Sequence, residues 1–210
     1  MRGLFISLEG IEGTGKSTQA ELLAEHFRKK GFAVVKTAEP GGTRISLKIR
    51  ELLLSTDNMN MDPLTELLLY NAARVQHVKE IIMPAIQRGD MVITDRFSDS
   101  TMAYQGYGRG IDPKLIDSLD LIATGRLRPH LTILLDIDVA TGLRRNRAAD
   151  KIDRLELEEI SFHERVREGF ISIAAKEPER IRLVDCSGDI ETVHRKVIDL
   201  ADTFLDGLRT

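Results

Sequence analysis

The segment from Gly10 to Ser17, GIEGTGKS, constrains the fold most strongly. It matches the pattern G-x-x-x-x-G-K-[ST] in full, directly after the apolar run GLFISLE (3–9) and at the start of a helical pattern. In a strand–turn–helix unit of this kind, backbone N–H groups converge on phosphate oxygens, and the helix N-terminus adds its positive end. The context therefore predicts a phosphate-binding loop rather than a chance glycine-rich turn.

Four further apolar runs alternate with helical patterns along the chain. The runs are FAVVKT (32–37), MVITD (91–95), LTILLDI (131–137) and RIRLVD (180–185). The helical patterns cover residues 16–30, 44–54, 62–88, 112–123, 139–147, 155–175 and 189–206. Strands that are apolar on both faces and separated by helices indicate a parallel sheet covered on each side. The sequence therefore predicts a three-layer, doubly wound α/β fold, with ligands beyond the carboxyl ends of the strands.

The composition excludes several classes of function. The chain has 210 residues and a net charge of −3, whereas a general nucleic-acid or membrane-surface binder carries a basic excess. Its single cysteine, Cys186, forms no internal disulfide and suits a reducing compartment, so we expect a cytoplasmic protein. Repeats and long apolar runs are absent from the sequence. We expect one domain over residues 1–210, with neither nucleic acid nor a membrane as partner.

Each residue type of the loop has a chemical role. We expect the loop to bind the phosphates of a nucleoside triphosphate through Gly10, Ile11, Glu12, Gly13, Thr14, Gly15, Lys16, Ser17 and Thr18. Lys16 should reach the β- and γ-phosphates, and the Ser17 hydroxyl should bind Mg²⁺. The run MVITD ends in Asp95, a position from which a carboxylate assists Mg²⁺ through water. The N-K-x-D box of GTPases is absent, but the loop alone does not separate a kinase from an ATP-driven machine.

Other stretches indicate an acceptor that is itself a nucleotide. Arg96 follows Asp95 directly, and it either pairs with that carboxylate or holds the phosphate of a second substrate. Arg50 lies near the middle of a helical run. Tyr70 and Arg74 share one helical face, so the ring could stack on a base and the guanidinium could hydrogen-bond it. More often, however, such a pair consists of one side chain in the core and one on the surface. A polar, glycine-broken segment after the third strand contains Ser98, Ser100, Thr101, Tyr104 and Gln105.

The ordered set of motifs resembles the thymidylate kinase family of the bacterial type. The family's order and spacing are kept by EGIEGTGKST, EPGGT, LLYNAARVQH, DRFSDSTMAYQGYGRGID and GLRRNRAADKIDRLE, which together extend over essentially the whole chain. The resemblance implies a P-loop NTPase fold with a five-stranded parallel sheet. It also implies ATP-dependent phosphorylation of dTMP to dTDP in dTTP synthesis, with Mg²⁺ as cofactor and a homodimer as the assembly.

The resemblance assigns residues to the phosphate and the base of the acceptor. Arg50 and Arg96 correspond to residues that hold the 5′-phosphate of thymidylate. Tyr70 stands at the position of a ring, usually Phe, that stacks on thymine. Arg74 corresponds to the residue that hydrogen-bonds the O4 edge of thymine. These matches favour a functional interpretation of Tyr70 and Arg74 over a structural one.

The resemblance also assigns residues to the sugar and to the edge of the base. Glu12 corresponds to an acidic loop residue that accepts a hydrogen bond from the 3′-hydroxyl of the acceptor, which explains an acid inside an anion-binding loop. Tyr104 corresponds to a ring that occupies the space of a ribose 2′-hydroxyl and favours deoxyribose. Thr101 and Gln105 match positions near the base edge, and we add Ser100 to the predicted acceptor site.

The basic segment 144–154, RRNRAADKIDR, resembles the mobile lid of the bacterial enzymes. In them the lid supplies a cation over the transferring phosphoryl group, because the phosphate loop carries no Arg. We predict Arg147 as this cation, with Arg145 and Lys151 as alternatives, beside Lys16 and Arg96 as the other catalytic residues. Arg154 lies in the same segment. A solvated basic helix end is the structural alternative.

Two other functions stay open. Another P-loop deoxynucleoside or nucleotide kinase is one, although it gives Arg50 and Arg96 no shared phosphate to bind. A non-catalytic nucleotide-binding regulator is the other, although the intact Lys16, Ser17 and Asp95 disfavour it. The helical run 62–88 is apolar on more than one face, so we expect part of it in the core and part in the homodimer interface.

Overall fold

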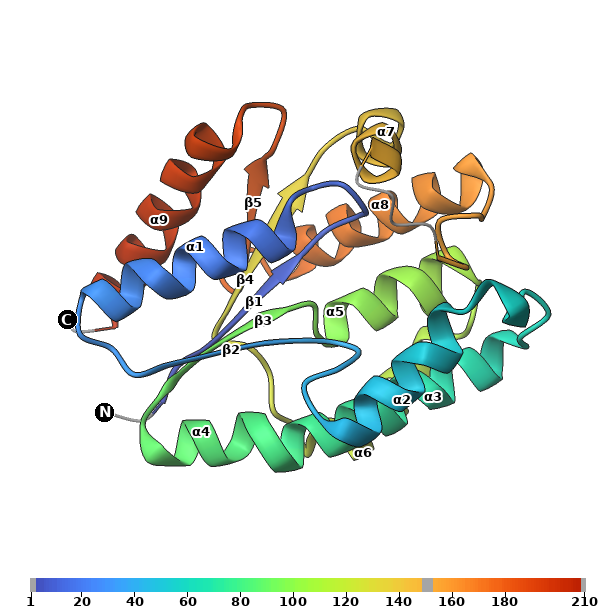
Figure 1. Cartoon of the computed structure of the whole chain (residues 1–210), viewed down its shortest axis with the longest axis horizontal. Coiled ribbons are helices and arrows are strands. Elements are labelled where there is room, and N and C mark those ends of the chain that lie inside the picture. Colours follow the sequence, from blue (N-terminus) through green and yellow to red (C-terminus); the bar gives the residue numbers. More distant parts are fainter. Residues whose placement is uncertain (1–2, 149–152, 209–210) are drawn as a thin grey trace.

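Figure 1 shows the computed structural model of the chain, which describes residues 3–148 and 153–208. Five parallel strands form one sheet in the order β2-β3-β1-β4-β5. The strands are β1 (Phe5–Glu9), β2 (Val34–Ala38), β3 (Met91–Asp95), β4 (Leu131–Asp136) and β5 (Ile181–Asp185). This arrangement confirms the predicted α/β fold with a parallel sheet covered on both faces.

One face of the sheet packs against α1 (Lys16–Lys29) and α9 (Ile190–Gly207). Leu23 and Phe27 of α1 and Val197 of α9 are fully buried there against the strands. The central strand β1 is buried along its whole length, because it has a neighbouring strand on each side and helices on both faces.

The other face is covered in two parts. Next to β4, α8 (Ile160–Lys176) packs through Val166 and Phe170. Next to β1 and β3, a long helical run packs through Ile82 and Ala85 onto Phe5. Among the described residues, no helix combines the length and the apolar character needed to cross a membrane.

The predicted helix 62–88 is a continuous helical run with one irregular turn. It consists of α3 (Pro63–His77), the π-helical turn η2 (Val78–Ile82) and α4 (Met83–Arg88). The N–H of Met83 donates to the carbonyl of Val78, five residues earlier, and the following Pro84 has no N–H to donate. A π turn at this point absorbs the missing hydrogen bond.

The segment predicted as polar and glycine-broken is helical. It forms α5 (Ser98–Thr101) and the π-helical η3 (Met102–Gly108). Gly106 lies inside this helix, and a Cβ on Gly108, its last residue, would lie 2.7 Å from Phe162 Cε2 of α8, so Gly108 allows close helix packing. The prediction was wrong here because glycine signals both chain breaks and tight contacts.

The remaining elements agree with the predicted ones apart from their ends. They are α2 (Arg44–Leu54), α6 (Pro113–Thr124) and α7 (Val139–Ala148). The short 3₁₀ helix η1 (Thr56–Asn58) was not predicted. The predicted helix 155–175 begins later, at Ile160 of α8. The preceding turn is held by Asp153 Oδ1, which accepts hydrogen bonds from the N–H groups of Leu155 (2.9 Å) and Glu156 (3.1 Å).

Candidate active site

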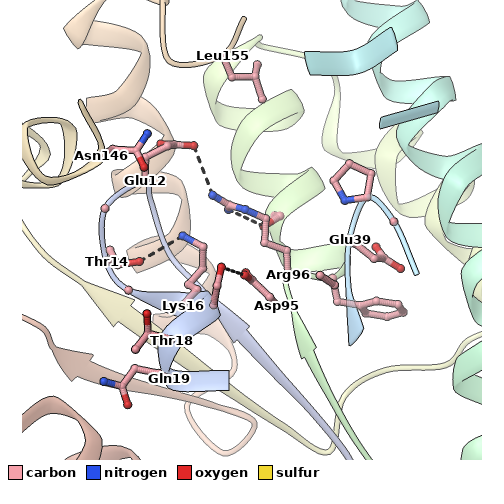
Figure 2. A pocket seen from close by; sticks show the side chains of 18 of the residues that line it. Glu12, Thr14, Lys16, Thr18, Gln19, Glu39, Asp95, Arg96, Asn146 and Leu155 are labelled. Carbon is pink, nitrogen blue, oxygen red and sulfur yellow. Dashed lines mark hydrogen bonds and ion pairs between the residues drawn. The ribbon is translucent and has the colours of Figure 1, made fainter. Parts of the chain in front are cut away.

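A cavity of about 1450 Å³ lies at the carboxyl edge of the sheet (Figure 2). Its walls come from the segments that follow β1, β2, β3 and β5, with parts of α2, α3 and α7. The predicted site residues that line it are Glu12, Gly13, Thr14, Gly15, Lys16, Ser17, Thr18, Arg50, Tyr70, Arg74, Asp95, Arg96, Ser100, Thr101, Tyr104, Gln105 and Arg145. Gly10, Ile11 and Arg147 are not among the described residues of its lining. One cavity therefore brings together residues predicted for both substrates.

The phosphate loop runs from the end of β1 to the first turn of α1. Gly13 has φ +72°, and a Cβ there would lie 2.0 Å from the carbonyl oxygen of Gly142, so only glycine fits. Lys16 folds back over the loop and donates to the Ile11 carbonyl (2.6 Å) and to Thr14 Oγ1 (3.2 Å; Figure 2). Burial, together with the nearby charge of Arg96, lowers the pKa of the Lys16 ammonium to about 8. A bound phosphate would relieve both effects.

Ser17 and Asp95 form the candidate metal position. The Ser17 hydroxyl donates to Asp95 Oδ2, which connects the start of α1 to the end of β3. The described residues contain no group of three or more His, Cys, Asp or Glu side chains that could hold a metal ion. One hydroxyl and one carboxylate suit Mg²⁺, which keeps water and substrate phosphate oxygens in its coordination shell.

Arg96 is held in place by the phosphate loop and by α5–η3. It has the left-handed φ of +72°, which is rare for a residue with a side chain. Its Nη1 donates to the Gly10 carbonyl (2.9 Å) and to Ser100 Oγ (3.1 Å), and its Nη2 to Tyr104 OH (3.1 Å) and Glu12 Oε1 (3.4 Å). None of these four hydrogen bonds goes to Asp95, so they do not form the predicted alternative, an ion pair between Arg96 and Asp95. Arg96 instead lies over the cavity beside the phosphate loop (Figure 2).

Glu12 points away from the concave side of the loop toward Arg96. Its Oε1 also accepts a hydrogen bond from Tyr104 OH, and its Oε2 lies 3.5 Å from His163 Nδ1 of α8. Burial alone would raise the pKa of Glu12, but the contact with His163 and the charges of Arg96 and Lys16 lower it to about 2. Glu12 is therefore an ionised acceptor at neutral pH.

A second buried acid, Glu9 at the end of β1, contacts the segment that follows Arg96. It accepts a hydrogen bond from the Phe97 N–H (2.7 Å), and its Oε2 lies 2.5 Å from Ser100 Oγ. Burial, reinforced by the charge of Asp99, raises the pKa of Glu9 to about 8. Ser100, predicted as an acceptor residue, thus bridges Glu9 and Arg96.

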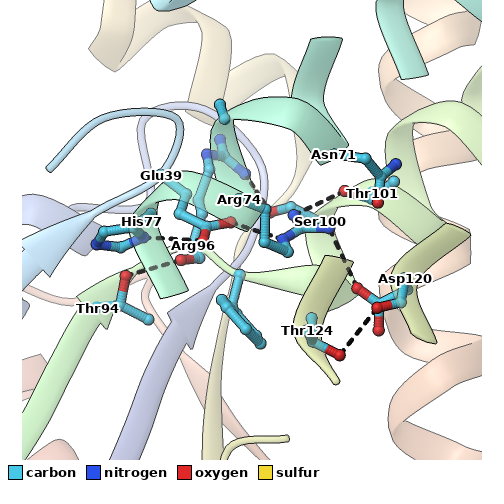
Figure 3. Close-up of polar contacts among 12 residues, drawn as sticks. Glu39, Asn71, Arg74, His77, Thr94, Arg96, Ser100, Thr101, Asp120 and Thr124 are labelled. Carbon is cyan, nitrogen blue, oxygen red and sulfur yellow. Dashed lines mark hydrogen bonds and ion pairs between the residues drawn. The ribbon is translucent and has the colours of Figure 1, made fainter. Parts of the chain in front are cut away.

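Arg74 is fixed at the other end of the cavity (Figure 3). Only 2% of its side chain is exposed, and it donates to Glu39 Oε2 (2.8 Å), Thr101 Oγ1 (2.8 Å) and Asp120 Oδ1 (3.3 Å). His77 in turn holds Glu39 through an Nδ1–Oε1 contact of 2.9 Å. The motif EPGGT was noticed in the sequence, but the role of Glu39 was missed, because its contacts reach 35 and 38 residues along the chain.

The other acceptor residues occupy the same end. Tyr70 is half-buried and lines the cavity, and Gln105 Nε2 donates to the buried Glu66 Oε1 (2.8 Å). Arg50 lies on α2 and donates to the Pro40 carbonyl (2.9 Å). Arg50 and Arg96 therefore line the same cavity from different elements, α2 and the segment that follows β3.

The basic segment 144–154 divides among several environments. Arg145 donates to the carbonyls of Cys186 (3.0 Å) and Ser187 (3.4 Å) beyond β5. Arg147 is exposed near the end of α7. Arg154 is buried and paired with Glu66, and it also donates to the Leu53 carbonyl (3.0 Å). Lys151 lies outside the described residues, and the identity of the lid cation stays a prediction.

The sequence and the structure can be compared with known proteins. The family model described as thymidylate kinase matches residues 8–197. A thymidylate kinase of Pelobacter propionicus is 49% identical over 202 residues, covering 93% of this chain and 92% of that protein. The thymidylate kinase of Pseudomonas fluorescens is 48% identical over 209 residues and 100% of both chains. The crystal structure of thymidylate kinase from Ehrlichia chaffeensis has a TM-score of 0.78 and 38% identity, covering 96% of this chain and 99% of that one. The chain belongs to the thymidylate kinase family.

Proposed function

We propose that this protein transfers the γ-phosphoryl group of ATP to dTMP and forms dTDP. The observation that carries the proposal is one cavity that is lined both by the phosphate loop with Lys16 and by Arg50 and Arg96. A triphosphate on the loop and a monophosphate on the two guanidinium groups then meet inside that cavity. Membership of the thymidylate kinase family supports dTMP as the acceptor.

The chemistry needs alignment and positive charge more than it needs a base. The phosphate oxygens of a monophosphate are already anionic at neutral pH, so the nucleophile requires no proton abstraction. Charge spreads over the moving phosphoryl group in a loose transition state. Lys16, Arg96 and a lid cation, for which we propose Arg147, stabilise that charge. Ser17, and Asp95 through water, would hold Mg²⁺, which would supply further positive charge to the phosphate oxygens.

Recognition of the base uses the far end of the cavity. We propose that Tyr70 stacks on thymine and that Arg74 donates to its O4 edge. The ion pair with Glu39 supports this role, because it fixes the direction of the guanidinium before a ligand arrives. Thr101 and Gln105 approach the same edge of the base.

The sugar lies between the base and the phosphate loop. We propose that Glu12 accepts the 3′-hydroxyl of the acceptor. Tyr104 packs against Phe162 and Phe170, 6.2 and 6.1 Å between ring centres, which supports its role as a rigid wall against a 2′-hydroxyl. A ribonucleotide would meet this ring, so the site should prefer deoxyribose.

The wider arrangement is also part of the proposal. Residues 1–210 act as one domain in the cytoplasm, without nucleic acid or a membrane as partner. The proposed lid covers about residues 144–154, of which 149–152 lie outside the described residues. A homodimer is supported by exposed apolar side chains on the adjacent helices α3 and α6, namely Leu64, Leu68, Leu121 and Ile122.

An acceptor panel tests the proposal. Purified protein is given ATP, Mg²⁺ and either dTMP, dUMP, ribosyl TMP, dCMP, thymidine or no acceptor, and ADP release is followed. We expect rapid ADP release with dTMP, slower release with ribosyl TMP and dCMP, and almost none without an acceptor. Acceptor-independent hydrolysis would indicate an ATP-driven machine, and no turnover at all would indicate a regulator. Preference for thymidine would indicate a nucleoside kinase.

A further inference from the structure

Two buried polar side chains face each other behind the phosphate loop. His163, on the first turn of α8, is 1% exposed, and its Nδ1 lies 3.5 Å from Glu12 Oε2. Both ring nitrogens of His163 lack a hydrogen-bond partner among the described residues, and so does Glu12 Oε2. Burying a polar atom without a hydrogen-bond partner costs free energy of folding. Two such groups that face each other therefore need an explanation.

The other oxygen of Glu12 is already held. Oε1 accepts from Tyr104 OH and from Arg96 Nη2, which leaves Oε2 as the oxygen without a fixed donor. A carboxylate offers about four lone-pair positions. Tyr104 and Arg96 fill two of them, and a donor on Oε2 fills a third, so one position is left for a hydroxyl group.

The ring of His163 is itself confined. It packs edge-on against Phe162, with ring centres 5.5 Å apart. A contact of 3.5 Å is longer than a hydrogen bond. In unliganded enzymes such contacts are often long and tighten only when substrate binds.

We propose that His163 is a positioning residue, which donates from Nδ1 to Glu12 Oε2 and fixes the carboxylate that receives the 3′-hydroxyl of the acceptor. This role rests on the proposed function, because it requires Glu12 to face the acceptor sugar. His163 does not touch the reacting atoms. Its loss should therefore weaken recognition of the hydroxyl group and leave the ATP side intact.

The test compares three variants with two acceptors. H163N keeps an amide N–H near the position of Nδ1, H163Q moves it toward the position of Nε2, and H163F keeps the ring without a donor. Each protein is assayed with dTMP and with its 3′-deoxy analogue, and the ratio of the two kcat/KM values measures recognition of the hydroxyl. A merely structural role for His163 would lower both values and leave the ratio unchanged.

We expect the wild type to prefer dTMP, and H163F to lose about 10- to 100-fold of that preference, the usual effect of one hydrogen bond to a charged group. H163N should stay within about 3-fold of the wild-type ratio, and H163Q should resemble H163F. The KM for ATP should be unchanged in all three. If H163F does not fold, the comparison of H163N with H163Q decides. Equal ratios of the two kcat/KM values in these two variants would overturn the proposal.

The control is H26N, because His26 on α1 pairs with Asp202 on α9 (3.1 Å) and is not part of the cavity lining. Its ratio should equal that of the wild type. A wild type that prefers dTMP beside an H163F with the same preference overturns the role of His163 alone. A wild type that phosphorylates both acceptors equally removes the role of Glu12 and that of His163 with it. A wild type inactive on dTMP overturns the proposed function itself, and both roles fall.

Discussion

At the residue scale, burial and neighbouring charges set the charge states around the phosphate loop. Glu12 and Lys16 share one small volume, in which Arg96 lies near both. The pKa of Glu12 falls to about 2 because three positive or hydrogen-bonding neighbours outweigh burial, whereas that of Lys16 falls to about 8 because burial and Arg96 act together. Glu12 therefore stays ionised at neutral pH, whereas the lowered pKa of Lys16 brings its titration close to physiological pH.

The lowered pKa of Lys16 predicts a pH dependence on the ATP side. The protonated form binds phosphate, and it is lost as pH rises through about 8 instead of through the usual 10.5. The value of kcat/KM for ATP reports the free enzyme, so we expect it to fall tenfold per pH unit above about pH 8. Initial rates from pH 6 to 10 at low ATP measure this. A flat profile up to pH 10 would contradict the buried, repelled state of Lys16.

Glu39 predicts an effect on the acceptor side only. E39Q removes one of the two charged partners of a guanidinium that is almost completely buried, so Arg74 is held in its direction less firmly, by Asp120 and Thr101 alone. We expect the KM for dTMP to rise by about tenfold or more, with little change in the KM for ATP. E51Q, an exposed acid on α2, is the matched control and should leave both constants unchanged. Equal effects of E39Q on both substrates would contradict a local role at the base.

At the scale of elements, the regular apolar and helical patterns predicted the fold well. Contacts between residues far apart in the sequence could not be predicted from these patterns. The five apolar runs became the five strands, because burial on both faces of a parallel sheet leaves a continuous apolar signal. The helix at 98–108 was missed because Gly106 and Gly108 were interpreted as breaks, whereas Gly108 packs against α8. Pro84 produced a π turn that periodicity does not show.

The candidate site was predictable to the extent that motifs are local. The phosphate loop lies within nine consecutive residues, so its context identified it. The contact of Glu12 with His163 spans 151 positions (163 − 12), and a single buried histidine in a helix gives no signal in one sequence. Arg154 likewise was one basic residue among several until its pairing with Glu66, 88 positions away, placed it in the interior.

The helix α7 carries the prediction for the lid. We expect R147A to lower kcat by about 10³-fold, in analogy with arginine residues that act on a transferring phosphoryl group. R144A is the matched control, because Arg144 is exposed on the same helix and donates to Thr141 Oγ1 (3.0 Å). Single-turnover assays at saturating substrates measure the effect. Turnover within a few-fold of wild type for R145A, R147A and K151A alike would contradict a lid cation in this segment.

At the scale of the whole molecule, the parallel sheet brings positively charged side chains together at one edge. Two polyanions must meet on a chain with a net charge of −3, so the positive groups have to be local. The carboxyl edge of the sheet gathers Lys16 after β1, Arg96 after β3 and Arg50 from α2 around one cavity. Acids at the same edge hold guanidinium groups in place, since Glu12 pairs with Arg96 and Glu39 pairs with Arg74.

One measurement tests this account most directly. A compound that joins thymidine and adenosine through a chain of phosphates between their 5′ positions should span the cavity. We expect it to compete with both ATP and dTMP, and we expect K16A and R50A each to weaken its inhibition. Competition with only one substrate, or inhibition that survives R50A unchanged, would contradict a single cavity in which the two phosphate groups meet.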